Sequence, residues 1–98
     1  MIRHIVLFKL REGLSREDAE VVATREALTN LGPALPMVRA WEVRPCFGDK
    51  PASHDFILIS EFDNEADLAQ YAVDPDHKVV IAKLDLITAG KATADFHI

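Results

Sequence analysis

The stretch MIRHIVLFKL (Met1–Leu10) decides the fold of this chain, together with DFILISEF (Asp55–Phe62). Both stretches are rich in β-branched and aromatic residues, which predicts strands. Apolar side chains fall at odd as well as even positions in the middle of each stretch, for example at Ile5 and Val6. This pattern is typical of strands that are covered on both faces.

A helix is predicted between these two strands, from Ser15 to Leu31. Ser15 and Asp18 resemble a capping box, and Gly32 followed by Pro33 is expected to end the helix. Apolar residues at helical spacing predict its inward face, which comprises Ala19, Val22, Ala23 and Ala27.

Further end signals predict two helices in the second half of the chain. Asp63 or Asn64 is expected to cap a short helix, and Asp74 with Pro75 marks the N-cap and first position of a longer helix that Gly90 ends. The predicted inward faces are Leu68, Tyr71 and Ala72 in the short helix and Val80, Leu84 and Ile87 in the longer one.

Alternation of apolar and polar residues predicts two more strands, Met37–Arg44 and Lys91–Ile98. The resulting order of elements predicts an α+β fold, a ferredoxin-like antiparallel four-stranded sheet with its helices on one face. The other face of the sheet is then bare, although the two central strands are apolar on both sides. We therefore expect a homodimer through the open sheet face, forming a dimeric α/β barrel.

The composition supports this expectation. The chain has 98 residues, of which 49% are hydrophobic, and a domain of that size hides only roughly 60 to 65% of its unfolded surface. Residues 1–98 are predicted to form a single domain. The net charge of −5 argues against nucleic acid or an anionic membrane as partner. A lone cysteine, Cys46, and no apolar stretch of about 20 residues predict a cytoplasmic protein.

Four short stretches carry a resemblance to a known family: His4–Lys9, Ile59–Phe62, Asp74–Val80 and Ala94–Phe96. In this order and spacing they resemble the Dabb family, the stress-responsive dimeric A/B barrel proteins. The resemblance implies a dimeric barrel. The family includes plant stress proteins of unclear activity and one well-understood type of enzyme, olivetolic acid cyclase, which closes a linear polyketide without a cofactor.

The resemblance to the cyclase implies a site. Tyr71 and His77 match its catalytic Tyr and His, and His4 matches a histidine of its pocket, so we expect His4, Phe8, Tyr71 and His77 to bind a ligand. With Asp74 as N-cap, His77 is the third residue of its helix, where the helix dipole favours the neutral ring that a general base needs. Asp74 stands where the cyclase has a histidine.

Three functions follow as alternatives. The first is binding of a small hydrophobic or aromatic molecule, without cofactor or metal, in a cavity between sheet and helices. The second is a polyketide cyclase-like enzyme with His77 as general base and Tyr71 stabilising the enolate. The third is a cofactor-free monooxygenase of similar barrel fold. Against all three stands a purely structural reading, in which His4, Tyr71 and His77 satisfy one another as a buried polar cluster.

Two remaining features favour ordinary structural roles. His54 and His97 could ligate a metal, but their spacing does not force them onto one helical face, so we expect surface positions. Trp41 lies on a half-polar strand, which predicts an interface or rim position.

Overall fold

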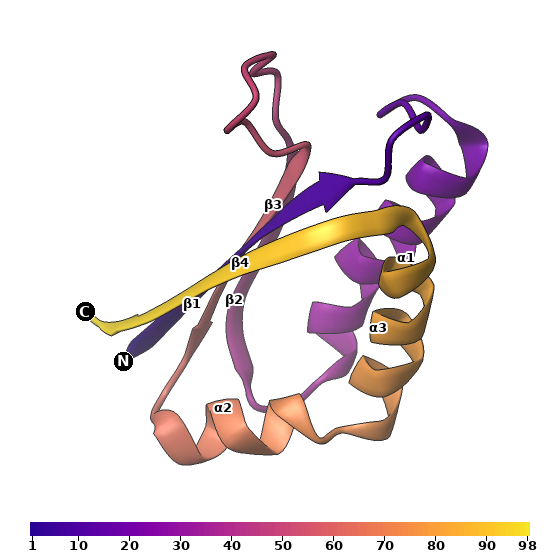
Figure 1. The fold of residues 1–98 in the computed structure, drawn as a ribbon. Coiled ribbons are helices and arrows are strands. Elements are labelled where there is room, and N and C mark those ends of the chain that lie inside the picture. Colours follow the sequence, from indigo (N-terminus) through magenta and orange to yellow (C-terminus); the bar gives the residue numbers. More distant parts are fainter.

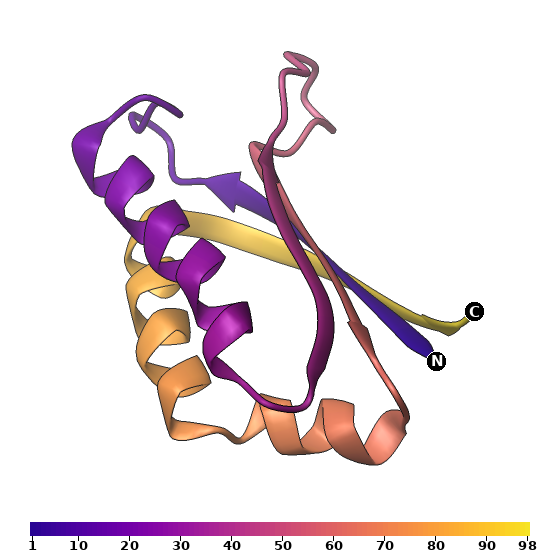
Figure 2. The same ribbon diagram turned by 180° about the vertical axis from the view of Figure 1, so that it is seen from behind.

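The structure, a computed structural model, describes residues 1–98 and contains one sheet and three helices (Figure 1). The elements are β1 (Ile2–Leu10), α1 (Ala19–Ala34), β2 (Val38–Pro45), β3 (Phe56–Phe62), α2 (Glu65–Ala72), α3 (Pro75–Ile87) and β4 (Thr88–His97). All strand pairs are antiparallel, in the order β2-β3-β1-β4. The helices lie on one side of this sheet (Figure 2), which confirms the predicted ferredoxin-like α+β fold.

The core lies between the helices and one face of the sheet. Phe8 of β1 stands opposite Phe56 of β3, and their stacked rings lie 4.5 Å apart between centroids. Phe62 and Leu84, from β3 and α3, complete this layer and are fully buried. Burial of each such side chain contributes roughly 1.5–3 kcal/mol to stability. The inward residues predicted for α3, Val80, Leu84 and Ile87, are all buried.

The opposite face of the sheet is covered by no element of the chain. It carries the odd-numbered residues of the central strands, and Ile5 there stands opposite Ile59. Both are only half-buried. The face also presents Phe96 of β4, which is 42% exposed, beside an ion pair of 3.0 Å between Arg3 and Glu61. The two-sided apolar pattern therefore leaves a hydrophobic surface beyond the core.

The first helix begins at Ala19 rather than Ser15, whose amide instead donates to the Asp18 carboxylate, and it ends later than predicted, because neither Gly32 nor Pro33 ends it. A proline in the last turn removes only one helical hydrogen bond, and the helix continues to Ala34. Gly32 instead permits close packing, since a Cβ at this position would lie 2.0 Å from Cγ of Trp41. Trp41 is consequently a partly buried residue beneath α1, where its Nε1 donates a hydrogen bond of 2.9 Å to the carbonyl of Leu28.

Two other predictions about the helices are wrong. The buried stripe of α1 consists of Val21, Thr24, Leu28, Leu31 and Gly32. The predicted alanine face lies largely outward, because the longer Val and Leu side chains bury more apolar area than Ala does. Gly90 does not end α3, which gives way directly to β4 at Thr88.

No helix is long and apolar enough to span a membrane.

Candidate functional site

Three side chains far apart in the sequence meet on the helix side of the sheet. His4 projects from β1, Tyr71 from α2 and His77 from the first turn of α3. The ring centroids of Tyr71 and His77 lie 4.2 Å apart, and those of His4 and Tyr71 lie 5.9 Å apart. The structure thus brings together the three polar residues that the sequence singled out.

These residues line a cavity of about 260 Å³ between the sheet and helices α2 and α3. Nine of its 14 lining residues are hydrophobic, including Tyr71 and the predicted Phe8, which forms part of the wall and is itself 2% exposed. The other five are His4, His77, Lys91, Thr93 and Asp95. A mostly apolar cavity with a few convergent polar groups is the usual form of a small-molecule site.

The ring of His77 is held by the end of the preceding helix. Its Nδ1 lies 3.2 Å from the carbonyl oxygen of Ala72, and because a carbonyl only accepts, Nδ1 must be the protonated nitrogen. Nε2 is then unprotonated in the neutral ring. Burial lowers the pKa of His77, as do the Coulombic interactions with His4 and Lys91, while the hydrogen bond to Ala72 and the charge of Asp74 oppose them. These influences together favour the neutral form of the His77 ring.

Local capping explains where His77 lies. The Asp74 carboxylate accepts a hydrogen bond of 2.8 Å from the backbone amide of Asp76, which starts α3 and makes His77 its third residue, as predicted. Asp74 is thereby engaged in capping and does not line the cavity. Asn64 caps α2 in the same manner, through Asp67. Both caps orient the helices that carry the site.

Tyr71 is the most enclosed polar group of the site. The residue is 3% exposed, and burial raises the pKa of its phenol far above the ordinary value of 10. The hydroxyl is not among the fully enclosed polar atoms that lack a partner, and the side chain lines the cavity. Tyr71 therefore stays protonated and offers its O–H to whatever occupies this space.

The sequence reasoning missed the contribution of β4. Lys91, Thr93 and Asp95 alternate along this edge strand and form one wall of the cavity. The Asp95 carboxylate accepts a hydrogen bond from Nδ1 of His4, which lies directly opposite it in the strand register. The alternation was visible in the sequence, but only the pairing of the terminal strands, β1 with β4, places this face beside His4.

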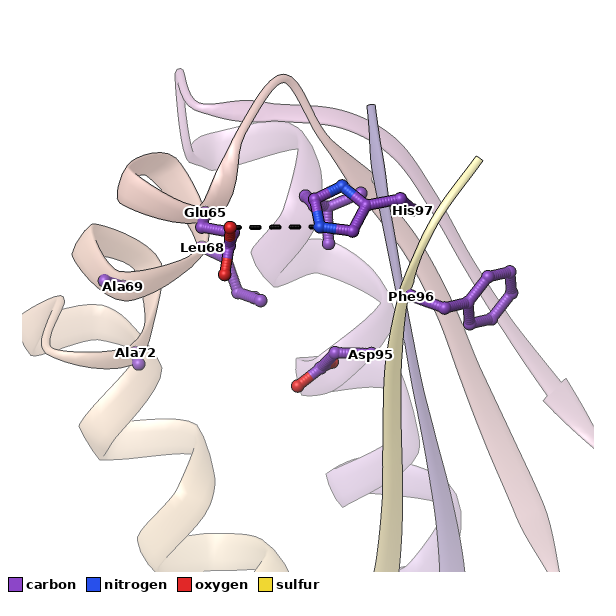
Figure 3. Close-up of a pocket in the computed structure, with 8 residues that line it drawn as sticks. Glu65, Leu68, Ala69, Ala72, Asp95, Phe96 and His97 are labelled. Carbon is purple, nitrogen blue, oxygen red and sulfur yellow. Dashed lines mark ion pairs between the residues drawn. The ribbon is translucent and has the colours of Figure 1, made fainter.

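A second cavity, of about 270 Å³, adjoins the first near the C-terminal end of β4. The two share Leu68, Ala72 and Asp95. Figure 3 shows His97 pointing toward α2, where it pairs with Glu65 at 3.8 Å, while Phe96 points to the other side of the strand. Both members of that pair are highly exposed, so the contact contributes little to stability.

His77 is expected to make the folded protein less stable in acid. Because its pKa in the folded state lies below the ordinary 6.5, the unfolded chain binds a proton at a pH where the folded chain does not. The free energy of unfolding therefore falls as the pH falls through about 6.5 toward the lower pKa of the folded state. Urea unfolding at several pH values should show this slope, and His77→Gln should remove part of it. Identical slopes in both proteins would contradict the assignment.

The fold and the cavity together define a class of protein: a ferredoxin-like α+β domain with a small, mostly apolar cavity between sheet and helices. Residues 2–98 match the family described as the stress responsive A/B barrel domain, Dabb, over almost the whole chain. The chain belongs to this family.

Individual relatives support the assignment. An uncharacterized protein of Streptomyces coelicolor is 38% identical over 82 residues, which is 84% of each chain. A dimeric protein of unknown function from Bacteroides fragilis, with a ferredoxin-like fold, has a TM-score of 0.80 at 30% identity, covering 99% of this chain and 95% of that one. A dimeric ferredoxin-like protein of unknown function from Thermobifida fusca has a TM-score of 0.84 at 25% identity, covering 99% and 90%.

Proposed function

We propose that the protein is a homodimer that binds a small hydrophobic or aromatic molecule in the cavity between sheet and helices. The cavity itself carries the proposal. An apolar cavity of about 150 Å³ is enough to bind benzene, so a space of about 260 Å³ accommodates one substituted aromatic ring. The phenol of Tyr71 and Nε2 of His77 would orient such a ring through one donor and one acceptor.

The dimer is proposed to form through the open face of the sheet. Ile5, Leu7, Ile57 and Ile59 form an apolar centre there that nothing in the chain covers. Contiguous apolar surface of this kind marks an association surface. The relatives from Bacteroides fragilis and Thermobifida fusca are described as dimeric, which supports association of this chain as well.

Ligand binding is expected to raise the stability of the protein measurably. At a free ligand concentration of about 100 times Kd, binding adds about 2.7 kcal/mol to the free energy of unfolding. A thermal-shift screen of monocyclic aromatic compounds, with native mass spectrometry to confirm stoichiometry, tests this expectation. Ala72→Phe should fill the space beside Tyr71 and abolish the shift.

Ala69→Phe is the matched control for this experiment. Ala69 lies on the same helix and lines only the second cavity, so the variant should keep the shift. Absence of any stabilising compound, or an equal shift in Ala72→Phe and the wild type, would overturn the binding function.

A cofactor-free cyclase-like activity is the second candidate, favoured by the tautomer of His77. Its Nε2 is free to take a proton from a carbon beside a carbonyl, and Tyr71 is placed 4.2 Å away, between ring centroids, to donate to the oxygen that becomes negative. A cofactor-free monooxygenase of similar barrel fold remains a further prediction.

The variant His77→Gln separates the enzyme from the binding module. Removal of a general base is expected to lower kcat by about 10²–10⁴-fold while the ligand Kd changes little. Turnover of an enolisable aromatic precursor, followed by chromatography, and Kd by calorimetry measure the two effects. Loss of binding and turnover in equal proportion would favour plain recognition.

A further inference from the structure

We propose that His4 and Asp95 form a proton-accepting pair, with Asp95 as positioning residue, and that the cavity binds a monocyclic phenol or enol as its anion. This inference rests on the proposed function, since it specifies the chemistry of the aromatic molecule that the cavity holds. It adds a role for His4 that recognition by shape alone does not require.

The geometry of the pair comes from the strand register. His4 and Asp95 are direct partners in the β1–β4 ladder, and their side chains point to the helix side of the sheet, where both line the cavity. The carboxylate Oδ1 accepts the hydrogen bond from Nδ1. Nε2 of His4 is therefore the nitrogen left for a ligand. A carboxylate on Nδ1 fixes the tautomer of a histidine and stabilises the imidazolium that forms when Nε2 gains a proton.

The two histidines of the cavity differ in their partners. His77 is bound through Nδ1 to the neutral carbonyl of Ala72, whereas His4 is bound to a carboxylate. His4 is enclosed, with 12% of its side chain exposed, and the titratable or charged groups around it are Asp95, Tyr71, His77 and Lys91. Among the two imidazoles, only His4 has an anionic partner that compensates a positive charge. It is the one suited to keep a proton taken from a ligand.

The proton balance of binding is simple. The O–H bond of the phenol breaks, its proton moves to Nε2 of His4, and the resulting imidazolium stays paired with the Asp95 carboxylate. The ligand keeps the electron pair as a phenolate oxygen. The protonated hydroxyl of Tyr71 donates a hydrogen bond to that oxygen, and the Lys91 ammonium in the cavity wall adds favourable charge. No oxidant, metal or second substrate enters.

The test uses p-nitrophenol, whose anion absorbs at longer wavelength than the neutral form. The full-length protein is titrated with the probe at a pH below the probe's pKa in water, and the difference spectrum gives the fraction bound as phenolate. We expect the wild type to bind mainly the anion. Asp95→Asn is expected to lower the ratio of bound phenolate to bound phenol by about tenfold, the effect of one pKa unit, and to weaken total binding by at most the same factor, because binding of the neutral form is unchanged.

Glu65→Gln is the matched control, because it removes a negative charge from the neighbouring cavity without contact to His4. It should bind the probe as the wild type does. Circular dichroism confirms that each variant is folded. Binding of the probe as neutral phenol, or an unchanged phenolate ratio in Asp95→Asn, overturns the inference.

Binding of p-nitrotoluene, which cannot ionise, separates this inference from the function on which it rests. If p-nitrotoluene binds and p-nitrophenol binds only in its neutral form, the aromatic site stands and the His4–Asp95 pair is refuted as a proton acceptor. If neither compound binds, the aromatic site and the inference both fail.

Discussion

Gly32→Ala is expected to destabilise the protein by about 3 kcal/mol, the cost of forcing an atom into a filled space. The added Cβ would lie 2.0 Å from Cγ and 2.2 Å from Cδ2 of Trp41. The indole cannot move away freely. Its Nε1 donates a hydrogen bond to the carbonyl of Leu28, and its ring packs edge-on against Tyr71 with 5.8 Å between the ring centroids. The clash outweighs the gain of about 1 kcal/mol that Ala brings to a helix interior.

Urea unfolding followed by circular dichroism measures this loss, and the chain offers a matched control. Gly90→Ala makes the same chemical change at a position where the new Cβ meets no atom within 4 Å, so the free energy of unfolding should hardly change. A double-mutant cycle with Trp41→Ala assigns the cause, since Gly32→Ala should cost little once the indole is gone. An equal cost with and without Trp41 would show that the clash is not the reason.

Ile59→Asp is expected to weaken the proposed dimer by about 1,000-fold or more. Ile59 lies on the open face opposite Ile5, at the apolar centre of the sheet. If two such faces meet, the new carboxylate is buried without a partner, which costs about 3–5 kcal/mol per unpaired charge. The protomer should remain folded, because the Ile59 side chain faces away from the core and is only half-buried in the isolated protomer.

Sedimentation velocity over a range of micromolar concentrations measures this effect. Val79→Asp provides the matched control, because Val79 lies on α3 with 57% of its surface exposed and outside the sheet face. This variant should keep the oligomeric state of the wild type. A wild-type protein that is monomeric at micromolar concentration, or an Ile59→Asp protein that dimerises as tightly as the wild type, would refute the interface.

Strands with apolar residues on both faces were the most predictable part of the fold. In β1 and β3, period-two alternation separates Val6 and Leu58 from Ile5 and Ile59, and the structure places the first pair on the helix side and the second on the open side. Alternation is a local consequence of strand geometry, so the sequence suffices to read it. The N-cap Asp74 was predictable for the same reason, whereas the sequence left Asp63 and Asn64 as alternatives for α2, of which Asn64 is the cap.

Helix ends and helix faces depended on contacts that no local pattern contains. Gly32 and Pro33 are usual stop signals, yet the helix continues to Ala34, and Gly32 lies where the indole of Trp41 packs against α1. Gly90 similarly lies inside β4, because pairing with β1 extends the strand back to Thr88.

The sequence by itself determined the two-faced central strands, the order of elements and the family, and through the family it pointed to His4, Tyr71 and His77. Only the tertiary structure decided how these residues act together. It joined Asp95 to His4, because β4 pairs with β1 across 91 positions of the chain, and it turned Nδ1 of His77 to the carbonyl of Ala72. Proton positions and cavity shape depend on neighbours brought in by folding, and such neighbours follow from packing rather than from the spacing of residues along the chain.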